Sequence, residues 1–210
     1  MARAVVFDIG NVLIEWQPER FFDREIGVDA RKAMFADVDL HAMNDLVDQG
    51  QNWRDTVYSC ADAHPKHAQA IRLWHDRWLE MASPAIDPCV DLLRALRQNN
   101  VPVLALSNFG IETFALAEKA YPFLSEFDQR WISGHLGVTK PDPRIYQMLE
   151  ETCGFAPHDL LFADDRAENI DAAATRGWAT HLFEGAEGWA KRLVEEGLLP
   201  FDTANQGKTP

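Results

Sequence analysis

The chain has 210 residues, of which 47% are hydrophobic and 25% are charged, and its formal net charge is −13. This length and composition are typical of one sizeable hydrophobic core, or of a core domain with a smaller insert. The negative charge argues against nucleic acid and against an anionic membrane surface as partners, because both attract basic patches.

The first predicted element is a strand over residues 4–7, four apolar residues that are followed directly by Asp8 and then by Gly10. A short apolar run bounded by a turn signal is typical of a strand buried on both faces of a sheet. Asp8 would then lie at the carboxyl end of this strand, where open parallel sheets bind their ligands. A carboxylate in this place suits a nucleophile or a metal ligand, although aspartate also caps turns.

Residues 15–83 show a helical pattern and no strand pattern. The large apolar residues of this segment recur at the three- and four-residue spacings of amphipathic helices; they include Trp53, Val57, Ile71, Trp74 and Trp78. We expect the tryptophans to form the core of this helical block rather than a ligand cage, since large aromatic side chains are commonly buried. The predicted domains are therefore a core of residues 1–14 and 84–201 and a helical cap of residues 15–83, with a disordered tail at 202–210.

From residue 85 onward, strand and helix patterns alternate. Predicted strands cover residues 101–106, 130–133, 160–163 and 178–183. Asp87-Pro88 and Asp142-Pro143 are each predicted to cap the start of a helix. Other predicted helices cover residues 111–120 and 188–198, and one runs through Ile170 and Ala174 to Gly177. Single helices between strands indicate parallel strands with right-handed connections. The expected fold class is α/β, a Rossmann-like parallel sheet with a small all-helical cap inserted after the first strand.

Polar side chains follow three of these strands, namely Asp8, Ser107-Asn108 and Asp164-Asp165, and Lys140 lies in a loop before a helix. If the strands are parallel and adjacent, these groups meet at one edge of the sheet. Three neighbouring carboxylates repel one another unless a cation neutralises them, and an oxygen-rich site suits Mg²⁺ rather than zinc. With Lys140 and the Ser107 hydroxyl, the site suits a phosphoryl group that a carboxylate attacks.

These stretches resemble the four motifs of the haloacid dehalogenase (HAD) superfamily, in the same order: Phe7-Asp8-Ile9-Gly10-Asn11-Val12, Leu106-Ser107-Asn108, Lys140-Pro141 and Phe162-Ala163-Asp164-Asp165. The helical insert stands where the superfamily has its small cap, and the resemblance covers nearly the whole chain. The sequence is most similar to small sugar-phosphate phosphatases of the α-glucose-1-phosphate phosphatase type, through the first motif and residues 137–146. The resemblance implies a HAD-like fold and hydrolysis of a phosphomonoester through an aspartyl phosphate.

The resemblance also assigns roles to individual residues. The implied groups are catalytic Asp8, Ser107 and Lys140; substrate-binding Gly10, Asn11, Ser107, Asn108 and Lys140; and Mg²⁺-binding Asp8, Gly10, Asp164 and Asp165. Asp8 is the implied nucleophile, and Lys140 bridges it to the phosphate. Each residue taken singly also fits an ordinary turn, surface charge or helix cap, whereas the four motifs together favour the site.

The sequence departs from the superfamily pattern at Gly10. Most phosphatases of the superfamily carry a second aspartate at this position, two residues after the nucleophile, as general acid and then base. General acid–base catalysis contributes about 10²- to 10⁴-fold, so its loss would slow hydrolysis without abolishing it. An anomeric sugar oxygen needs little protonation as a leaving group, and sugar 1-phosphates are therefore the first substrates to expect.

Two other functions remain open. In a 2-haloacid dehalogenase Asp8 would attack carbon without Mg²⁺, but such enzymes usually carry an aromatic residue in the place of Gly10 and a Ser-Asn pair in the place of Asp164-Asp165. A catalytically weak module that binds a phosphate ligand would account for Gly10, but it gains nothing obvious from a nucleophile at Asp8.

The expected partner is a small phosphorylated metabolite, without nucleic acid or membrane, and the protein is expected to be a monomer or a homodimer. No apolar run approaches the roughly 20 residues that span a bilayer, and no signal-peptide pattern precedes the first strand. The three cysteines, at positions 60, 89 and 153, are odd in number and widely spaced, which predicts neither disulfides nor a zinc cluster. We therefore expect a cytoplasmic protein.

Overall fold

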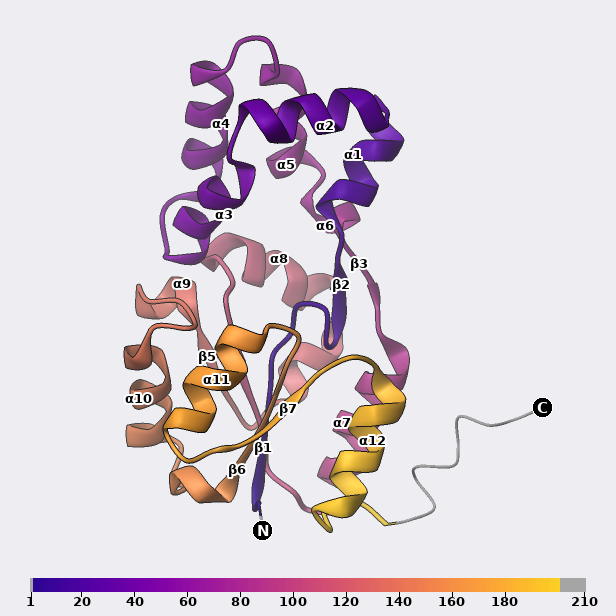
Figure 1. Cartoon of the computed structure of the whole chain (residues 1–210), viewed down its shortest axis with the longest axis vertical. Coiled ribbons are helices and arrows are strands. Elements are labelled where there is room, and N and C mark those ends of the chain that lie inside the picture. Colours follow the sequence, from indigo (N-terminus) through magenta and orange to yellow (C-terminus); the bar gives the residue numbers. More distant parts are fainter. Residues whose placement is uncertain (1, 201–210) are drawn as a thin grey trace, which may run out of the picture.

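The computed structural model describes residues 2–200, so that the tail predicted at 202–210 lies outside the described residues. Its centre is a sheet of five parallel strands in the order β5-β4-β1-β6-β7 (Figure 1). The strands of this sheet are β1 (Ala4–Phe7), β4 (Val103–Ser107), β5 (Gln129–Ile132), β6 (Leu160–Asp164) and β7 (Ala179–Leu182). The predicted α/β fold with a Rossmann-like parallel sheet is confirmed.

The central strand β1 is paired on both sides. Its Phe7 is aligned with Ala105 of β4 and with Ala163 of β6. The backbone N–H of Asp8 then donates to the Ala163 carbonyl at 2.9 Å, which continues the β6 pairing by one residue. Because the three strands run in the same direction, the polar residues that end them arrive at one edge of the sheet.

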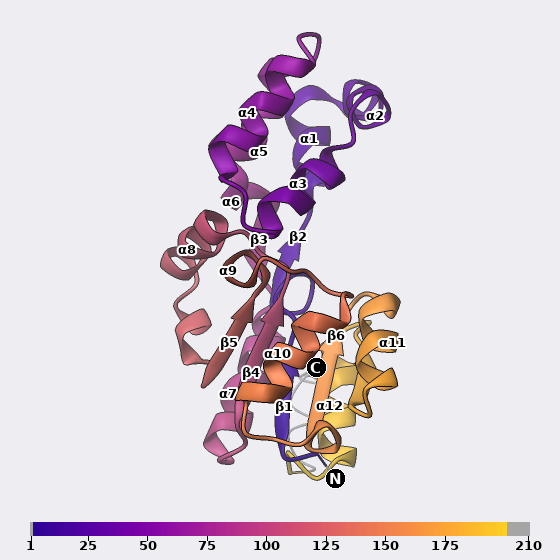
Figure 2. The ribbon, with the colours of Figure 1, turned by 90° about the vertical axis from the view of Figure 1, so that its left-hand side faces the viewer.

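Helices cover both faces of the sheet (Figures 1 and 2). On the side of Val6, α10 (Pro143–Thr152) and α11 (Ala167–Thr175) form a core in which Tyr146 meets Phe162 with ring centres 6.3 Å apart. On the opposite side, α7 (Asp87–Gln98) and α12 (Ala186–Glu195) pack against the sheet, and Phe7 meets Trp189 edge to face at 5.7 Å. All four residues of β1 are therefore buried, as predicted for a central parallel strand.

Six helices stand beyond the carboxyl ends of the strands (Figure 1). They are α1 (Pro18–Ile26), α2 (Val28–Asp37), α3 (Leu40–Asp48), α4 (Trp53–Ala63), α5 (Ala68–Asp76) and α6 (Trp78–Met81), and we call them the helical lobe. The predicted apolar residues form its core, since Trp53, Val57, Ile71, Trp74 and Trp78 are all buried. Within the described part of the chain, no helix is long and apolar enough to cross a membrane.

The prediction that residues 15–83 are wholly helical is wrong at both ends. β2 (Ile14–Trp16) and β3 (Ala82–Ala85) form an antiparallel ribbon that joins the lobe to the sheet. Strands of three and four residues are too short to show a period of two, and their pairing joins segments far apart in the sequence. The predicted domain boundaries fall inside these strands, and the division into two domains stays a prediction.

Other elements differ from prediction mainly at their ends. Ser133 opens the short helix α9 (Ser133–Leu136) instead of ending β5, and α12 begins two residues earlier than predicted. Asp142 caps α10 by accepting from the Arg144 N–H at 2.9 Å, as expected, whereas the N-cap of α7 is Ile86 instead of Asp87. The remaining elements are α8 (Ile111–Ala120), η1 (Pro122–Glu126) and η2 (Pro157–Asp159).

The lobe meets the sheet domain where two backbones pack directly on each other. A Cβ atom on Gly50, which follows α3, would lie 2.5 Å from the carbonyl oxygen of Gly134 in α9. On its other side Gly134 packs against the loop between β4 and α8 of the sheet domain itself, since a Cβ atom on Gly134 would lie 2.7 Å from the Phe109 carbonyl oxygen and 2.8 Å from the Ile111 nitrogen. Since backbone atoms cannot move aside cheaply, glycine is required at this contact.

We predict that Gly134→Ala lowers the free energy of unfolding by about 1–3 kcal/mol, the usual cost of overpacking. Gly188→Ala in α12 is the matched control, because its Cβ atom would find nothing closer than His181 Cε1 at 4.0 Å. Alanine there should be neutral or stabilising by about 0.5–1 kcal/mol. Urea unfolding of both variants measures the difference, and equal effects would contradict the close packing of Gly134 on the loop between β4 and α8.

Candidate active site

Asp8 lies directly after β1, and its carboxylate is held by three donors. Oδ1 accepts from the Ile9 backbone N–H at 2.7 Å, from Ser107 Oγ at 2.6 Å and from Lys140 Nζ at 2.9 Å. Within residues 2–200, no hydrogen bond reaches Oδ2. One oxygen of Asp8 is therefore fixed by the protein, while the other is available to a ligand.

Lys140 lies between two buried carboxylates. Its Nζ is 2.9 Å from Asp8 Oδ1 and 2.6 Å from Asp164 Oδ2, and its side chain is 1% exposed. Asn108 fixes the Lys140 backbone, because its Nδ2 donates to the Lys140 carbonyl at 3.0 Å and its Oδ1 accepts from the Lys140 N–H at 2.7 Å. In this structure the amide of Asn108, expected to bind phosphoryl oxygens, positions the lysine.

Burial dominates the electrostatics of this group. It raises the pKa of Asp8 to about 6; the Lys140 charge opposes the rise and the Asp164 charge adds to it. Burial by itself would lower the pKa of Lys140, but the charges of Asp164 and Asp8 outweigh it, and the pKa is raised. The ammonium group therefore stays charged and partly neutralises the two carboxylates.

Asp164 is the last residue of β6, Asp165 follows it, and the two have different surroundings. Asp164 is fully buried, and besides Lys140 it accepts from the Arg166 N–H at 2.8 Å and from Asn169 Nδ2 at 2.9 and 3.0 Å. Asp165 is half-buried and faces the cavity described below. Asn169 was not among the predicted residues, although a polar residue one helical turn into α11 was the available signal.

Asn11 connects Asp165 with the ribbon. Its Nδ2 donates to Asp165 Oδ2 at 2.9 Å, and its Oδ1 accepts from the Trp16 N–H of β2 at 2.9 Å. Its φ of 54° is in the left-handed region, which asparagine tolerates better than most residues. The amide predicted to contact substrate is thus bonded to the protein at both ends.

The donor set fits a divalent cation that prefers oxygen ligands. One carboxylate oxygen each from Asp8, Asp164 and Asp165 lie within 4.8 Å of one another. The single Lys140 charge balances only part of this cluster, and burial together with the Asp164 charge raises the pKa of Asp165. In addition, the Oδ1 atom of Asn169 is buried without a hydrogen-bond partner among the described residues. Carboxylate oxygens without histidine or cysteine favour Mg²⁺ over zinc.

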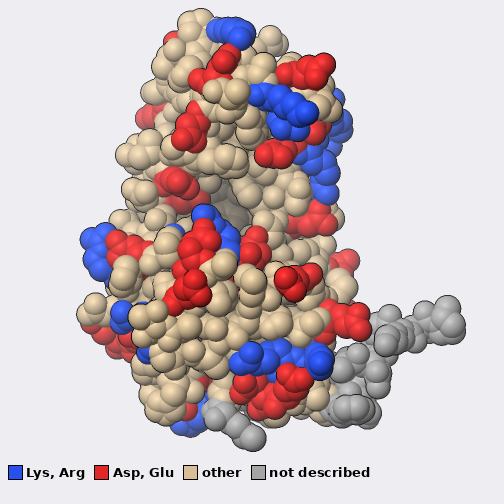
Figure 3. Space-filling model, in the orientation of Figure 1, with Lys and Arg blue, Asp and Glu red and all other residues tan. Residues whose placement is uncertain are grey.

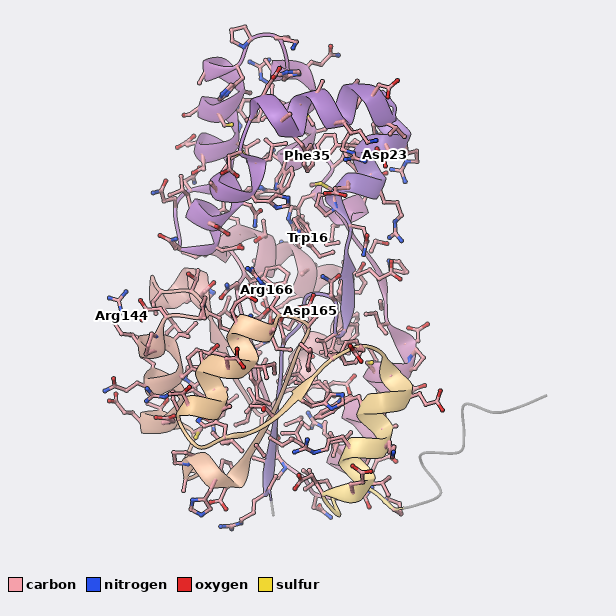
Figure 4. The ribbon with its side chains drawn as sticks, in the orientation of Figure 1. Trp16, Asp23, Phe35, Arg144, Asp165 and Arg166 are labelled. Atoms are coloured by element: carbon pink, nitrogen blue, oxygen red, sulfur yellow. The ribbon has the colours of Figure 1, made fainter. Side chains whose placement is uncertain are left out.

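These residues line a cavity of about 420 Å³ between the sheet and the helical lobe. The sheet side contributes Asp8, Gly10, Asn11, Ser107, Asn108, Phe109, Lys140, Asp165, Arg166 and Asn169, and the lobe and ribbon contribute Ile14, Glu15, Trp16, His41, Asn44, Asp45, Asp48, Trp78 and Ala82. The surface is hollowed at this level, with charged side chains around the opening (Figure 3). In the same orientation, Trp16 lies above Asp165 and Arg166 (Figure 4). All predicted site residues except the fully buried Asp164 line this one cavity.

Comparison with known proteins identifies the family. The model of the haloacid dehalogenase-like hydrolases matches residues 2–177. The chain belongs to this family. The sequence resemblance to the HAD superfamily is therefore confirmed, and the protein is a HAD-type hydrolase.

One relative matches this HAD protein over most of the length of both chains. The D-ribitol-5-phosphate phosphatase of Bacteroides thetaiotaomicron is 23% identical over 207 residues, which cover 92% of this chain and 98% of the relative. Two further matches are partial: the chain spans 36% of the drimenol cyclase of Aspergillus calidoustus and 46% of a flavin mononucleotide hydrolase of Arabidopsis thaliana.

Solved structures of HAD proteins share the fold. A HAD family enzyme from Bacteroides thetaiotaomicron, in complex with magnesium and inorganic phosphate, matches with a TM-score of 0.73 at 21% identity, covering 91% of this chain and 99% of that one. An L-2-haloacid dehalogenase from Xanthobacter autotrophicus matches with a TM-score of 0.61 at 18% identity, covering 98% and 87%. At these identities the likeness shows the fold alone.

We predict that Lys140→Met lowers the free energy of unfolding by about 3 kcal/mol at pH 8 in EDTA, because it leaves two buried carboxylates without their cation. The loss should be smaller at pH 5. The pKa of Asp8 is already raised. A carboxyl group with a raised pKa makes the folded protein less stable as the pH rises through that pKa.

Urea unfolding at both pH values measures this loss, with the exposed Lys119→Met in α8 as the matched control. A loss that is independent of pH, or one that Lys119→Met reproduces, would contradict the assigned ion pairs.

Proposed function

We propose that this chain is a Mg²⁺-dependent phosphomonoester hydrolase that acts on a small phosphorylated metabolite through an aspartyl phosphate. The observation that carries the proposal is the arrangement of Asp8, which has one oxygen fixed by Lys140 and Ser107 and the other available to a ligand. A carboxylate held rigidly at the end of a central strand suits nucleophilic attack. The phosphatase relative that matches over 98% of its length supports the same chemistry.

In the proposed reaction, Asp8 Oδ2 attacks phosphorus, and the bond from phosphorus to the leaving-group oxygen breaks. Water then attacks the phosphorus of the aspartyl phosphate, which releases inorganic phosphate and restores the carboxylate. Lys140 and the Ser107 hydroxyl lie beside Asp8 and would donate to the phosphoryl oxygens as negative charge builds on them.

Asp8, Asp165 and the Gly10 carbonyl would hold Mg²⁺, while Asp164 supports them from behind through Lys140. The bound ion supplies positive charge that the phosphoryl group and the carboxylates require together. Asp164 is less suited to direct coordination, since its oxygens already accept from Lys140, Arg166 and Asn169.

A sugar phosphate is the proposed substrate class. The lobe side of the cavity offers carboxylate, amide and imidazole groups, from Glu15, His41, Asn44, Asp45 and Asp48. Such groups pair with hydroxyl groups, and a cavity of about 420 Å³ is the size of ordinary small-molecule sites. We infer that the lobe acts as the cap that selects the leaving group. The predicted cytoplasmic location and oligomeric state stay predictions.

We predict that Asp8→Asn abolishes phosphate release while leaving the far-ultraviolet circular dichroism spectrum unchanged. The assay uses a panel of sugar phosphates and p-nitrophenyl phosphate, with Mg²⁺ and then with EDTA, and the exposed Asp171→Asn is the matched control. Activity should require Mg²⁺ and remain in Asp171→Asn. No phosphate release by the unmodified protein from any compound would overturn the phosphatase, and halide release from 2-haloacids would then identify the dehalogenase.

Mg²⁺ binding can be measured without an activity assay, through the melting temperature of the protein. A ligand at 100 times its Kd stabilises the folded state by about 2.7 kcal/mol, so Mg²⁺ should raise the melting temperature of the unmodified protein. Asp165→Asn should lose most of this increase, whereas Asp171→Asn should keep it. An equal Mg²⁺-dependent increase in both variants would show that the ion binds elsewhere.

A further inference from the structure

A half-buried carboxylate faces the cavity from the helical lobe. Asp48 is the last residue of α3 and lines the same cavity as Asp8. Its position is fixed on two sides, because its backbone carbonyl accepts from Ser133 Oγ of α9 at 2.6 Å and its Oδ2 accepts from Asn44 Nδ2 at 2.9 Å. Asp48 therefore belongs to the lobe but is tied to the sheet domain.

The side chains behind Asp48 make its carboxylate rigid. The indole Nε1 of Trp74 donates to Asn44 Oδ1 at 3.1 Å, which orients the Asn44 amide so that its nitrogen points at Asp48. Trp74 itself is 1% exposed and stacks on Phe22 in the core of the lobe. A side chain supported in this way can hold a fixed place opposite a reacting group.

The surroundings of Asp48 favour the protonated form of its side chain. Removal of its carboxyl group from water raises the pKa of Asp48 to about 7, and the carboxylates of Asp45 on the same helix and Asp8 across the cavity add to the rise. The backbone N–H of Gly110, at the start of α8, opposes it. Such a group exists in both protonation states near neutral pH, as a general acid that becomes a general base requires.

We propose that Asp48 is the catalytic proton donor to the leaving group, and afterwards the base that takes the proton from water, in the place of the side chain that Gly10 does not have. This assignment rests on the proposed phosphatase function. It places the acid–base group on the lobe, on the side of the cavity where the leaving group would lie, and the nucleophile on the sheet.

The other titratable groups of the lobe wall suit this task less well. Glu15 is ion-paired with Arg20 Nη1 at 2.7 Å, and both Asp45 and His41 are exposed to solvent. Of the charged groups that line this wall, Asp48 is the one tied by hydrogen bonds both to the lobe core and to the sheet domain.

The proton balance of the reaction is complete with Asp48. As Asp8 bonds to phosphorus and the ester P–O bond breaks, the carboxylic acid of Asp48 passes its proton to the leaving oxygen, which departs as an alcohol. The Asp48 carboxylate then takes one proton from the water that attacks the aspartyl phosphate. Inorganic phosphate leaves, and Asp8 is again a carboxylate while Asp48 is again protonated.

The test compares leaving groups that need a proton with one that does not. Asp48→Asn should lower kcat/KM for a sugar or alkyl phosphate by about 10²-fold or more, with a much smaller loss for p-nitrophenyl phosphate, whose phenolate leaves unprotonated. kcat/KM reports the steps up to loss of the leaving group, so the later role of Asp48 as base does not obscure the comparison. Asp55→Asn in α4 of the same lobe, exposed and outside the cavity lining, is the control and should keep the ratio of the two rates.

Equal losses on both substrates would overturn the proposal and would indicate a structural role where the lobe packs on the sheet. No loss on either would overturn it as well. In the unmodified protein, a series of aryl phosphates should show a shallow dependence of kcat/KM on the pKa of the leaving group. A steep dependence would contradict the proton-donor role of Asp48, even if Asp48→Asn failed to fold. An unmodified protein inactive on every phosphate would instead refute the phosphatase function itself.

A second substitution distinguishes a catalytic role of Asp48 from a structural one. Gly10 has no heavy atom within 4 Å of an added Cβ, and its φ is not in the left-handed region, so that position 10 has room for a Cβ atom. Adding Gly10→Asp to Asp48→Asn should restore activity on the alkyl phosphate by at least about 10-fold, because the acid is supplied two residues after the nucleophile. If Asp48→Asn only loosened the packing of the lobe on the sheet, an aspartate at position 10 would not repair it. Failure of the rescue in a folded protein would count against the proposal.

Discussion

The buried ion group of Asp8, Lys140 and Asp164 is the constraint on which the rest of the structure depends. Two carboxylates and an ammonium group have been removed from water, which is expensive unless each charge is paired and hydrogen-bonded. The group therefore requires three separate segments to meet within hydrogen-bonding distance. The parallel register of β1 and β6 brings the two carboxylates together, and Asn108 at the end of β4 holds the loop that carries the lysine.

Three asparagine side chains hold this arrangement in place. Asn11 joins Asp165 to the ribbon strand β2, and Asn108 joins β4 to Lys140. Asn169 donates a hydrogen bond to Asp164. An amide can donate and accept at once without adding charge, which suits positions that border a cluster of carboxylates. Asn11 has a further consequence, because it links a proposed metal ligand to the strand that leads into the helical lobe.

The two walls of the cavity, one from the sheet domain and one from the helical lobe and the ribbon, carry different kinds of groups. The sheet wall carries the groups that would act on phosphorus. Asp8 and Ser107 are held at the ends of strands, and Lys140 is held in its loop by Asn108. The lobe wall carries groups on helices and on the ribbon, where the side chains can change without disturbing the sheet. The close backbone contact of Gly50 with Gly134 fixes the distance between the walls. In this arrangement Asp48 occupies the lobe wall, yet it is tied to α9 of the sheet domain.

The sequence by itself determined the α/β class, the succession of sheet strands and helices along the chain, and the residues that end the strands. These features are local, because an apolar run, a turn signal and a following Asp or Ser-Asn pair are all contained within a few residues. The helical pattern of residues 15–83 was equally readable, apart from the short strands β2 and β3, whose partners are distant in the sequence.

Only the tertiary structure decided what each polar side chain contacts. The sequence could not show that the amides of Asn11 and Asn108 are occupied by the protein, that Asn169 supports Asp164, or that Asp48 lies in the cavity wall. Asp48 resembles any other acidic residue at the end of a surface helix. Its pKa is raised chiefly because its carboxyl group is removed from water, and the charges of Asp45 and Asp8 add to the rise. Asp8 comes close only when the lobe packs over the carboxyl ends of the strands.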